Sequence, residues 1–147
     1  MKPYHFLRIA SLLTLIHAAL HTIGGVFGKP DPGPAALAVS AMIADQFTVF
    51  GLQRSYWDFY MGLGLAVTIL LTAEAVVFWT LGSLAKKDGM ALRPTLMVFF
   101  FGYLGLAVNS YFNFFFGPVI VEVLIAMCLG FAILKAEPSY LSQRIEE

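Results

Sequence analysis

The sequence predicts an all-α, polytopic membrane protein: a four-helix transmembrane bundle with a short interfacial helix in its first exterior connection. Hydrophobic residues make up 59% of the 147 residues and charged residues only 12%, against about 25% in a soluble domain. The apolar residues gather in four segments, at residues 4–27, 56–84, 94–112 and 118–134. Each approaches the ~20 apolar residues with which a helix crosses a bilayer while satisfying its own backbone hydrogen bonds.

The first span, residues 4–27, resembles a signal peptide because basic residues precede its apolar run. No convincing small-x-small cleavage site follows, so we expect this segment to be retained as the first helix. Small and polar residues recur along it at spacings of three and four, which places them on one helix face. They are Ala10, Thr14, His17, His21 and Gly24. Such a face is typical of contact with other helices rather than with lipid.

The first exterior connection, residues 28–55, is the longest in the chain. It opens with GKPDPGP, whose prolines exclude a helix. Residues 35–53 are mostly apolar, and a short helix over the outer face of the bundle is predicted there. The apolar residues at helical spacing are Val39, Met42, Ile43, Phe47 and Phe50. A fifth span is disfavoured because almost no turn separates this segment from the next span. Its role as a lid or as a packing element stays open.

The other connections are short. Residues 86–93 (KKDGMALR) form a polar loop between the second and third spans, with Gly89 as its turn residue. Residues 113–117 leave room only for a tight turn, which predicts that the third and fourth spans form an antiparallel hairpin. The four spans and their connections therefore use nearly all of the chain. We expect a single domain, residues 1–147, with no room for a separate soluble catalytic domain.

The basic residues predict the orientation. If the spans alternate from a cytoplasmic N-terminus, the exterior segments hold only Lys29 and Arg54. The cytoplasmic segments then hold Lys2, Arg8, Lys86, Lys87, Arg93, Lys135 and Arg144. This excess of positive charge on one side predicts that both termini are cytoplasmic, and the pattern fits a bacterial inner membrane.

Charge and cysteine content exclude several classes of function. Nine basic residues balance nine acidic ones, so no net field attracts nucleic acid. The single cysteine, Cys128, forms neither an internal disulfide nor a CxxC pair, and we expect it to be an apolar filler. The sequence does not identify a cofactor.

Ionisable side chains within spans are rare and usually face the interior of a bundle. From the predicted topology, His21, Asp58 and Glu122 lie in the outer half of the membrane, with Asn109 at a similar depth and His17 near the middle. Together they predict an outer-half pocket. The aromatic residues that would flank a ligand there are Trp57, Tyr60 and Tyr103.

Two carboxylates have local interpretations. Asp58 follows Arg54 by four residues, so the two are expected to pair along one helix face. Glu74 lies in the inner half, about 160° around the helix from Asp58. With no basic residue nearby in sequence, Glu74 is expected to be protonated and to donate a hydrogen bond to a neighbouring helix, or to carry a proton.

Three interpretations of His17 and His21 stay open. The imidazoles form structural hydrogen bonds between helices, or they bind the polar head of a lipid, quinone, sterol or other small apolar molecule. In the third, the HxxxH spacing supplies two metal ligands, with Glu122 or Asp58 as the third. A single haem held by both histidines is disfavoured because axial ligands approach from opposite faces of the ring.

These interpretations lead to three functional hypotheses. The first is a membrane protein that binds a small apolar ligand. The second is an enzyme that uses His21 and Glu122 as an acid–base pair on a lipid-like substrate. The third is an accessory subunit, as a homo-oligomer or in a larger membrane complex, whose small and polar faces point outward.

The run Arg54–Gly64 (RSYWDFYMGLG), with HxxxH in the first span, resembles an uncharacterised group of small four-span bacterial membrane proteins. The resemblance covers most of the chain and implies the four-span fold without an activity. In size and span count the chain is also similar to DoxX-type quinone-linked proteins and to the sterol isomerase and sigma-2 receptor superfamily. That superfamily holds an apolar ligand above buried acids; this likeness implies fold alone.

Overall fold

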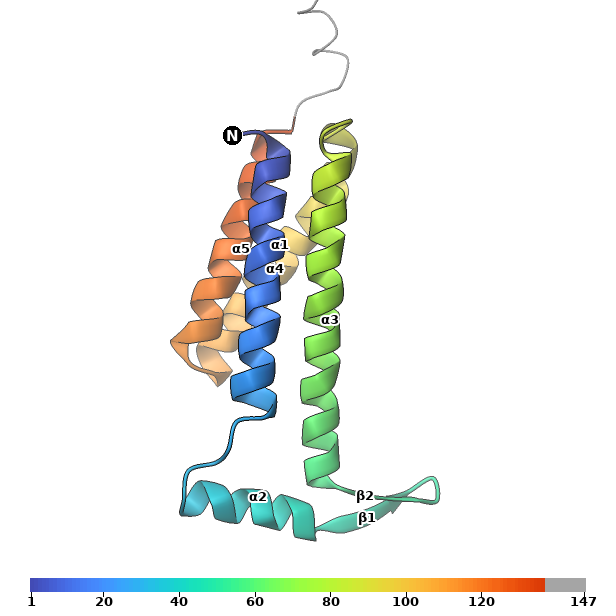
Figure 1. The fold of residues 1–147 in the computed structure, drawn as a ribbon, viewed down its shortest axis with the longest axis vertical. Coiled ribbons are helices and arrows are strands. Elements are labelled where there is room, and N and C mark those ends of the chain that lie inside the picture. Colours follow the sequence, from blue (N-terminus) through green and yellow to red (C-terminus); the bar gives the residue numbers. More distant parts are fainter. Residues whose placement is uncertain (137–147) are drawn as a thin grey trace, which may run out of the picture. The chain divides into compact units, whose positions relative to one another are not determined.

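The computed structural model describes residues 1–136 and confirms the all-α fold class with four long apolar helices (Figure 1). Arg144, one of the basic residues counted above, lies outside the described residues. The long helices are α1 (Pro3–Leu20), continued by a π-helical segment η1 (His21–Val26), then α3 (Tyr56–Leu84), α4 (Arg93–Asn113) and α5 (Phe116–Leu134). A 3-10 turn, η2 (Met90–Leu92), leads into α4. The four long helices (α1 with η1, α3, α4 with η2, and α5) are each long and apolar enough to cross a membrane.

The chain divides into two compact units. The first contains Met1–His17 and the chain from Leu71 onward, and therefore most of α1, the C-terminal half of α3, α4 and α5. The second contains Ala18–Leu70.

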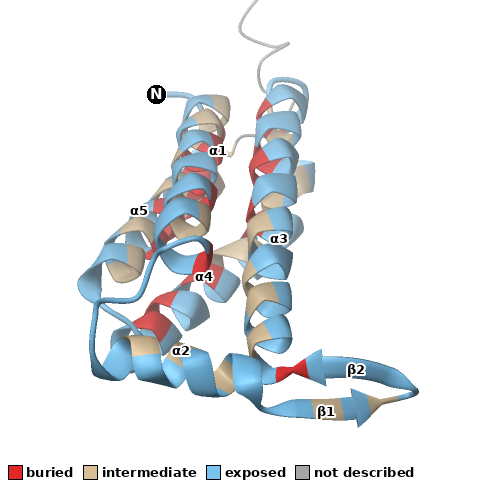
Figure 2. Cartoon of the chain, turned by 60° about the horizontal axis from the view of Figure 1, so that its bottom comes forward, coloured by how far each residue is buried: buried red, intermediate tan, exposed pale blue. Residues whose placement is uncertain are grey.

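The core of the first unit is formed by large side chains that are almost fully buried. Leu7, Phe78, Leu96, Ile125 and Leu129 are each exposed by 1% or less. Phe78 packs edge-to-face on Phe99, with the ring centroids 5.0 Å apart. Figure 2 shows buried positions as narrow stripes along the helices, with most of each helix exposed. This pattern suits helices whose remaining faces meet lipid.

Helices α4 and α5 form the predicted antiparallel hairpin, in which Phe114 and Phe115 make the turn. A β-carbon added at Gly130 on α5 would lie 3.3 Å from the ring of Phe100 on α4. The glycine therefore lets this ring pack directly against the α5 backbone.

The second unit contains α2 (Pro34–Ala44) and an antiparallel hairpin of β1 (Gln46–Val49) and β2 (Leu52–Ser55). The helix predicted over residues 35–53 is therefore correct only in its first part. At Asp45 the backbone becomes extended, and the segment that follows is rich in aromatic and β-branched residues that favour strands. Phe50 and Gly51, with φ of 48° and 81°, close the hairpin through a two-residue turn.

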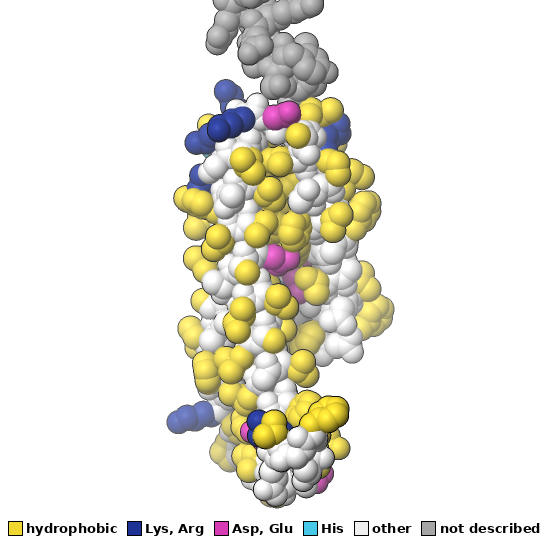
Figure 3. Space-filling model, turned by 90° about the vertical axis from the view of Figure 1, so that its right-hand side faces the viewer, with side chains coloured by type: hydrophobic (Ala, Val, Ile, Leu, Met, Phe, Trp, Pro, Cys, Tyr) yellow, Lys and Arg dark blue, Asp and Glu magenta, His cyan; other side chains and the backbone are white. Residues whose placement is uncertain are grey.

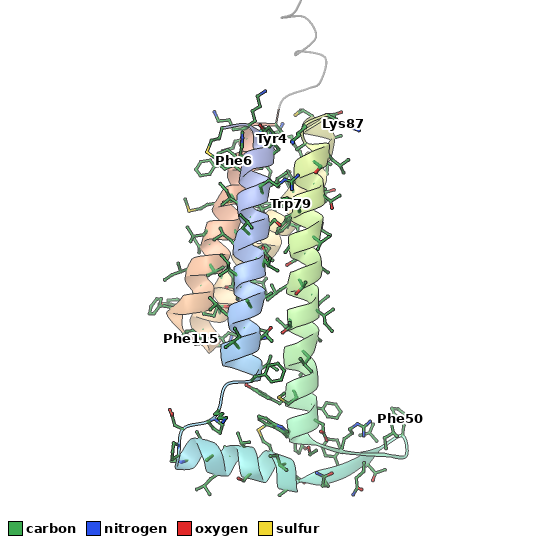
Figure 4. The ribbon with its side chains drawn as sticks, viewed as in Figure 1. Tyr4, Phe6, Phe50, Trp79, Lys87 and Phe115 are labelled. Atoms are coloured by element: carbon green, nitrogen blue, oxygen red, sulfur yellow. The ribbon has the colours of Figure 1, made fainter. Side chains whose placement is uncertain are left out.

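The hairpin is anchored to the start of α3 by aromatic contacts. The Phe47 ring lies 5.0 Å from that of Tyr56 and 5.6 Å from that of Phe59, centroid to centroid. Phe47 therefore serves strand packing rather than the helical stripe that its spacing suggested. Phe50, at the tip, is fully exposed (Figure 4).

Candidate functional site

A largely buried group of acidic and hydroxyl side chains lies within the first unit, and we call it the Tyr103 cluster. Its members are Thr14, Glu74, Tyr103, Ser110 and Glu122. The Tyr103 hydroxyl donates a hydrogen bond of 2.8 Å to Glu74 Oε2 and lies 3.4 Å from Thr14 Oγ1. Tyr103 is only 1% exposed and Thr14 is fully buried. Three helices thus bring three polar groups together in the apolar interior.

Glu122 is the least satisfied member of the cluster. Only 4% of the residue is exposed. Its Oε1 accepts a 3.0 Å hydrogen bond from Ser110 Oγ, whereas Oε2 is buried and has no hydrogen-bond partner among residues 1–136. Glu122 also lies within electrostatic range of the Tyr103 hydroxyl. A buried carboxyl oxygen without a partner is costly, which makes this atom a candidate contact for a bound group.

Helical periodicity explains how these side chains meet. Tyr103, Ala107 and Ser110 are spaced by four and three residues and form the buried face of α4. Glu122 begins the buried face of α5, which continues through Ile125 and Ala126. The carboxyl group of Glu122 therefore points toward α4 and meets Ser110, one turn from the end of that helix.

The chemistry of the Tyr103 cluster follows from its composition. It contains two carboxyl groups, three hydroxyl groups and no basic side chain. An ionised carboxyl group only accepts hydrogen bonds, whereas a protonated one also donates. The cluster can therefore hold a hydroxyl, a carbonyl or an amine of a ligand, or exchange a proton with it.

The second unit holds a different set of polar contacts, between η1 and the first half of α3. His21 Nε2 lies 3.0 Å from the Gly64 carbonyl oxygen, and because a carbonyl only accepts, this nitrogen carries the proton. Thr22 Oγ1 lies 3.0 Å from Thr68 Oγ1, and Tyr60 donates a 3.2 Å bond to the Gly25 carbonyl. These bonds support the structural interpretation of His21.

The π-helical backbone of η1 contributes to this arrangement. The amide of Phe27 bonds to the carbonyl of Thr22, five residues earlier. A β-carbon added at Gly25 would lie 3.3 Å from Nδ1 of His21, so the glycine leaves room for the imidazole. π-Helical turns are frequent at functional sites, and here the turn positions the His21 ring.

Asp58 caps α3 and does not use Arg54 as its principal partner. Its Oδ2 accepts hydrogen bonds from the backbone and hydroxyl of Ser55, at 2.8 and 3.0 Å, while Ser55 Oγ accepts from the Asp58 amide. This is a capping box. Arg54 donates instead to the Gln53 carbonyl and acts on Asp58 only through longer-range electrostatics. The predicted Arg54–Asp58 pair is therefore a minor interaction.

The predicted pocket residues are distributed over the two units. Tyr103 and Glu122 belong to the Tyr103 cluster. The half-buried His17 is in the same unit but is not a member of the cluster. Asn109 is exposed and accepts a hydrogen bond from Asn113. In the second unit are His21, the exposed Asp58, and Trp57, whose ring stacks on that of Tyr60 at 5.2 Å. Because His21 and Glu122 fall in different units, their acid–base pairing stays a prediction.

Ser110 was not among the residues predicted from the sequence, and Glu74 was expected to lie apart from the others. Two signals could have found them. Ser110 is seven residues from Tyr103 and thus on the same helix face, unlike Asn109. Glu74 is one helical turn from Phe78, which belongs to the core.

The metal interpretation gains no support. Within the described part of the chain, no three histidine, cysteine or acidic side chains lie close enough together to hold a metal ion. Comparisons of the chain with protein-family models, with curated proteins and with solved structures find no match.

Proposed function

We propose that this protein is a binding protein for a small apolar molecule, a lipid, quinone or sterol, whose polar head is held by the Tyr103 cluster. The observation that carries the proposal is the buried Glu122 Oε2, which lacks a hydrogen-bond partner among residues 1–136. A ligand hydroxyl or carbonyl placed there would satisfy this oxygen, by donating to a carboxylate or accepting from a carboxylic acid.

The surroundings of the cluster restrict the class of ligand. Phe78 packs against Tyr103, with the ring centroids 6.0 Å apart, and the helix faces outside the core are apolar. A molecule that reaches the cluster from within the membrane is therefore mostly hydrocarbon with one polar group. Lipids, quinones and sterols share this construction.

The half-buried Glu74 provides access to the cluster. Figure 3 shows acidic side chains at mid-height on one face, surrounded by hydrophobic ones. Glu74 is of intermediate exposure, whereas Tyr103 and Glu122 are buried. A ligand approaching from the lipid would meet Glu74 first, and its polar group would then replace or join the bond between Glu74 and Tyr103.

The proposal includes a location. Four apolar helices make the chain an integral membrane protein, and the distribution of basic residues supports cytoplasmic termini in a bacterial inner membrane. In that orientation Lys86, Lys87 and Arg93 are cytoplasmic, whereas Lys29 and Arg54 are exterior.

Native mass spectrometry of the detergent-purified protein, with solvent extraction of copurifying molecules, tests the proposal. We expect a stoichiometric apolar compound that is lost in Glu122→Gln. Asp58→Asn is the matched control, because it also removes an intramembrane carboxylate, but one already bonded to Ser55. An empty wild-type protein, or a compound retained equally in both variants, would overturn the proposal. A chemically altered compound that accumulates with time would instead favour an enzyme acting on a lipid-like substrate.

One observation favours a second candidate function, that of a subunit of a homo-oligomer or of a larger membrane complex. Gly102, Gly105 and Asn109 lie on an exposed face of α4, and a β-carbon added at either glycine would meet no atom within 4 Å. Small and polar residues on an exposed face of a spanning helix favour helix association. Gly105→Leu should then shift the mass of the detergent-solubilised particle while leaving a ligand at Glu122 in place. An unchanged particle mass would remove this candidate.

A further inference from the structure

A groove between α1 and α3 in the first unit is independent of the Tyr103 cluster. Its volume is about 260 Å³. The side chains at its rim are about half exposed: Leu12 by 52%, Leu15 by 49% and Trp79 by 49%. Trp79 projects from α3 beside α1 (Figure 4). Because the groove lies along two membrane-spanning helices, the molecule that fills it is hydrocarbon or another helix.

The floor of the groove has no unsatisfied polar group. Ser11 Oγ donates a 2.6 Å hydrogen bond to the Ala75 carbonyl, and both residues are buried. This bond joins the two helices beneath the groove. Apart from the hydroxyl of Thr72 the remaining lining is apolar, and a hydrocarbon chain fits it better than a polar ligand does.

A guanidinium group lies at one end of the groove. Arg8 Cζ lies over the Trp79 ring, 3.4 Å from its centroid, and Arg8 Nη2 donates a 2.9 Å bond to Ser83 Oγ. A β-carbon added at Gly82 would lie 3.3 Å from Arg8 Nε, so the glycine makes room for the side chain. No carboxylate forms an ion pair with Arg8 among residues 1–136, and its Nη1 has no hydrogen-bond partner there.

Other basic side chains share this end of the unit. Lys86 Nζ lies over the Tyr4 ring, 5.0 Å from its centroid, and Lys2 and Lys87 are exposed nearby in sequence. Figure 3 shows lysine and arginine side chains gathered at this end. The acidic residue of the loop, Asp88, accepts a hydrogen bond from the Ala91 amide. The end of the groove is therefore positively charged and suits an anionic group.

From this combination we propose that the groove binds an anionic phospholipid from the leaflet that faces the N-terminus. One acyl chain lies along Leu15, Leu12 and Trp79, and the phosphate is attracted to Arg8. Arg8 and Leu15 are seven residues apart, about 10 Å along the helix, which is the length of chain that the groove covers. The stacking on Trp79 fixes the planar guanidinium at the point where the headgroup meets the chain.

The fluorescence of Trp79 tests this site directly. The chain has two tryptophans, so Trp57→Phe leaves Trp79 as the only one. This variant is reconstituted in phosphatidylcholine vesicles that contain either brominated phosphatidylglycerol or brominated phosphatidylcholine with identical acyl chains. Bromine quenches tryptophan on contact. We expect about fivefold stronger apparent binding of the anionic lipid, the ratio that corresponds to roughly 1 kcal/mol for one basic residue at the membrane surface.

Two variants distinguish binding of the anionic lipid at Arg8 from diffuse electrostatic attraction of that lipid to the basic end of the groove. Arg8→Gln should abolish the preference, whereas Lys87→Gln, which removes an exposed charge at the same end, should keep it. Val76→Phe, which narrows the groove from its rim, should reduce quenching by both lipids. Circular dichroism checks that each variant is folded, and Arg8→Lys replaces Arg8→Gln if the latter is not. The lysine should keep part of the preference because it keeps the charge without the planar stack.

Three results would overturn the proposal. Equal quenching by the two lipids in the Trp57→Phe protein would remove the headgroup preference. Equal loss of preference in Arg8→Gln and Lys87→Gln would show a diffuse effect. Absence of quenching by either lipid, together with a dimeric particle mass, would show that a second copy of the chain covers the groove.

Discussion

The Tyr103 hydroxyl donates a 2.8 Å hydrogen bond to Glu74 across the interface of α4 and α3. Both residues lie within membrane-spanning helices, far from bulk water. Intramembrane carboxyl groups face partners of this kind because an unpaired one is costly in hydrocarbon. Glu74 therefore has a structural partner that its sequence neighbourhood did not reveal.

Removing this bond should destabilise the protein. Tyr103→Phe is expected to lower the free energy of unfolding by about 0.6–1.7 kcal/mol, which extends from the average to the largest value measured for hydrogen bonds between membrane helices. Unfolding by a denaturing detergent, followed by circular dichroism, measures the change. The double variant with Glu74→Gln should show a coupling of similar size, because the two side chains share one interaction. Additive effects would mean that the hydroxyl and the carboxyl group do not interact.

The partner of Glu122 can be tested by comparing neighbouring residues on α4. Ser110→Ala should lower the melting temperature and couple with Glu122→Gln, because Ser110 Oγ bonds to Glu122 Oε1. Asn109→Ala is the matched control, since Asn109 is exposed and bonds to Asn113. It should change stability little and show no coupling with Glu122→Gln. The opposite pattern would restore Asn109 as the neighbour of Glu122 that depth along the sequence suggested.

The Tyr103–Glu74 and Ser110–Glu122 hydrogen bonds show which features of the fold and of the site could be predicted from the sequence. Hydropathy and length identify all four spans, because lipid requires long apolar helices whatever the details of packing. The direction in which an individual polar side chain points is harder to predict, because each step of one residue along a helix turns the side chain by about 100° around the helix axis. Asn109 and Ser110 share a depth and differ only in that rotation. The helix prediction was wrong over residues 46–55 for another reason. Phe47 and Phe50 fit a helical spacing by coincidence, and the β-branched residues and Gly51 form a hairpin instead.

His21 should contribute to stability through its bond to the Gly64 carbonyl. His21→Leu keeps much of the side-chain volume but removes the donor, and leaves the carbonyl with the Thr68 hydroxyl as its remaining side-chain partner. We expect a fall in the melting temperature of the protein in detergent. His21→Gln, which can still donate, should recover part of the loss. A His21→Leu protein as stable as the wild type would argue against the structural interpretation and in favour of a role in ligand binding.

The orientation can be tested with single cysteines. In a Cys128→Ser background, which removes the only native thiol, a cysteine at Pro32 should react in intact cells with a membrane-impermeant maleimide. A cysteine at Asp88 should react only after the membrane is permeabilised. One helix that is long enough to span the membrane, α3, lies between the two positions along the chain, so their labelling is expected to differ whichever way the chain is inserted. If Asp88→Cys is the one labelled from outside, both termini are exterior. The basic end of the groove, at Arg8, would then lie at the outer leaflet, against the positive-inside distribution of charge.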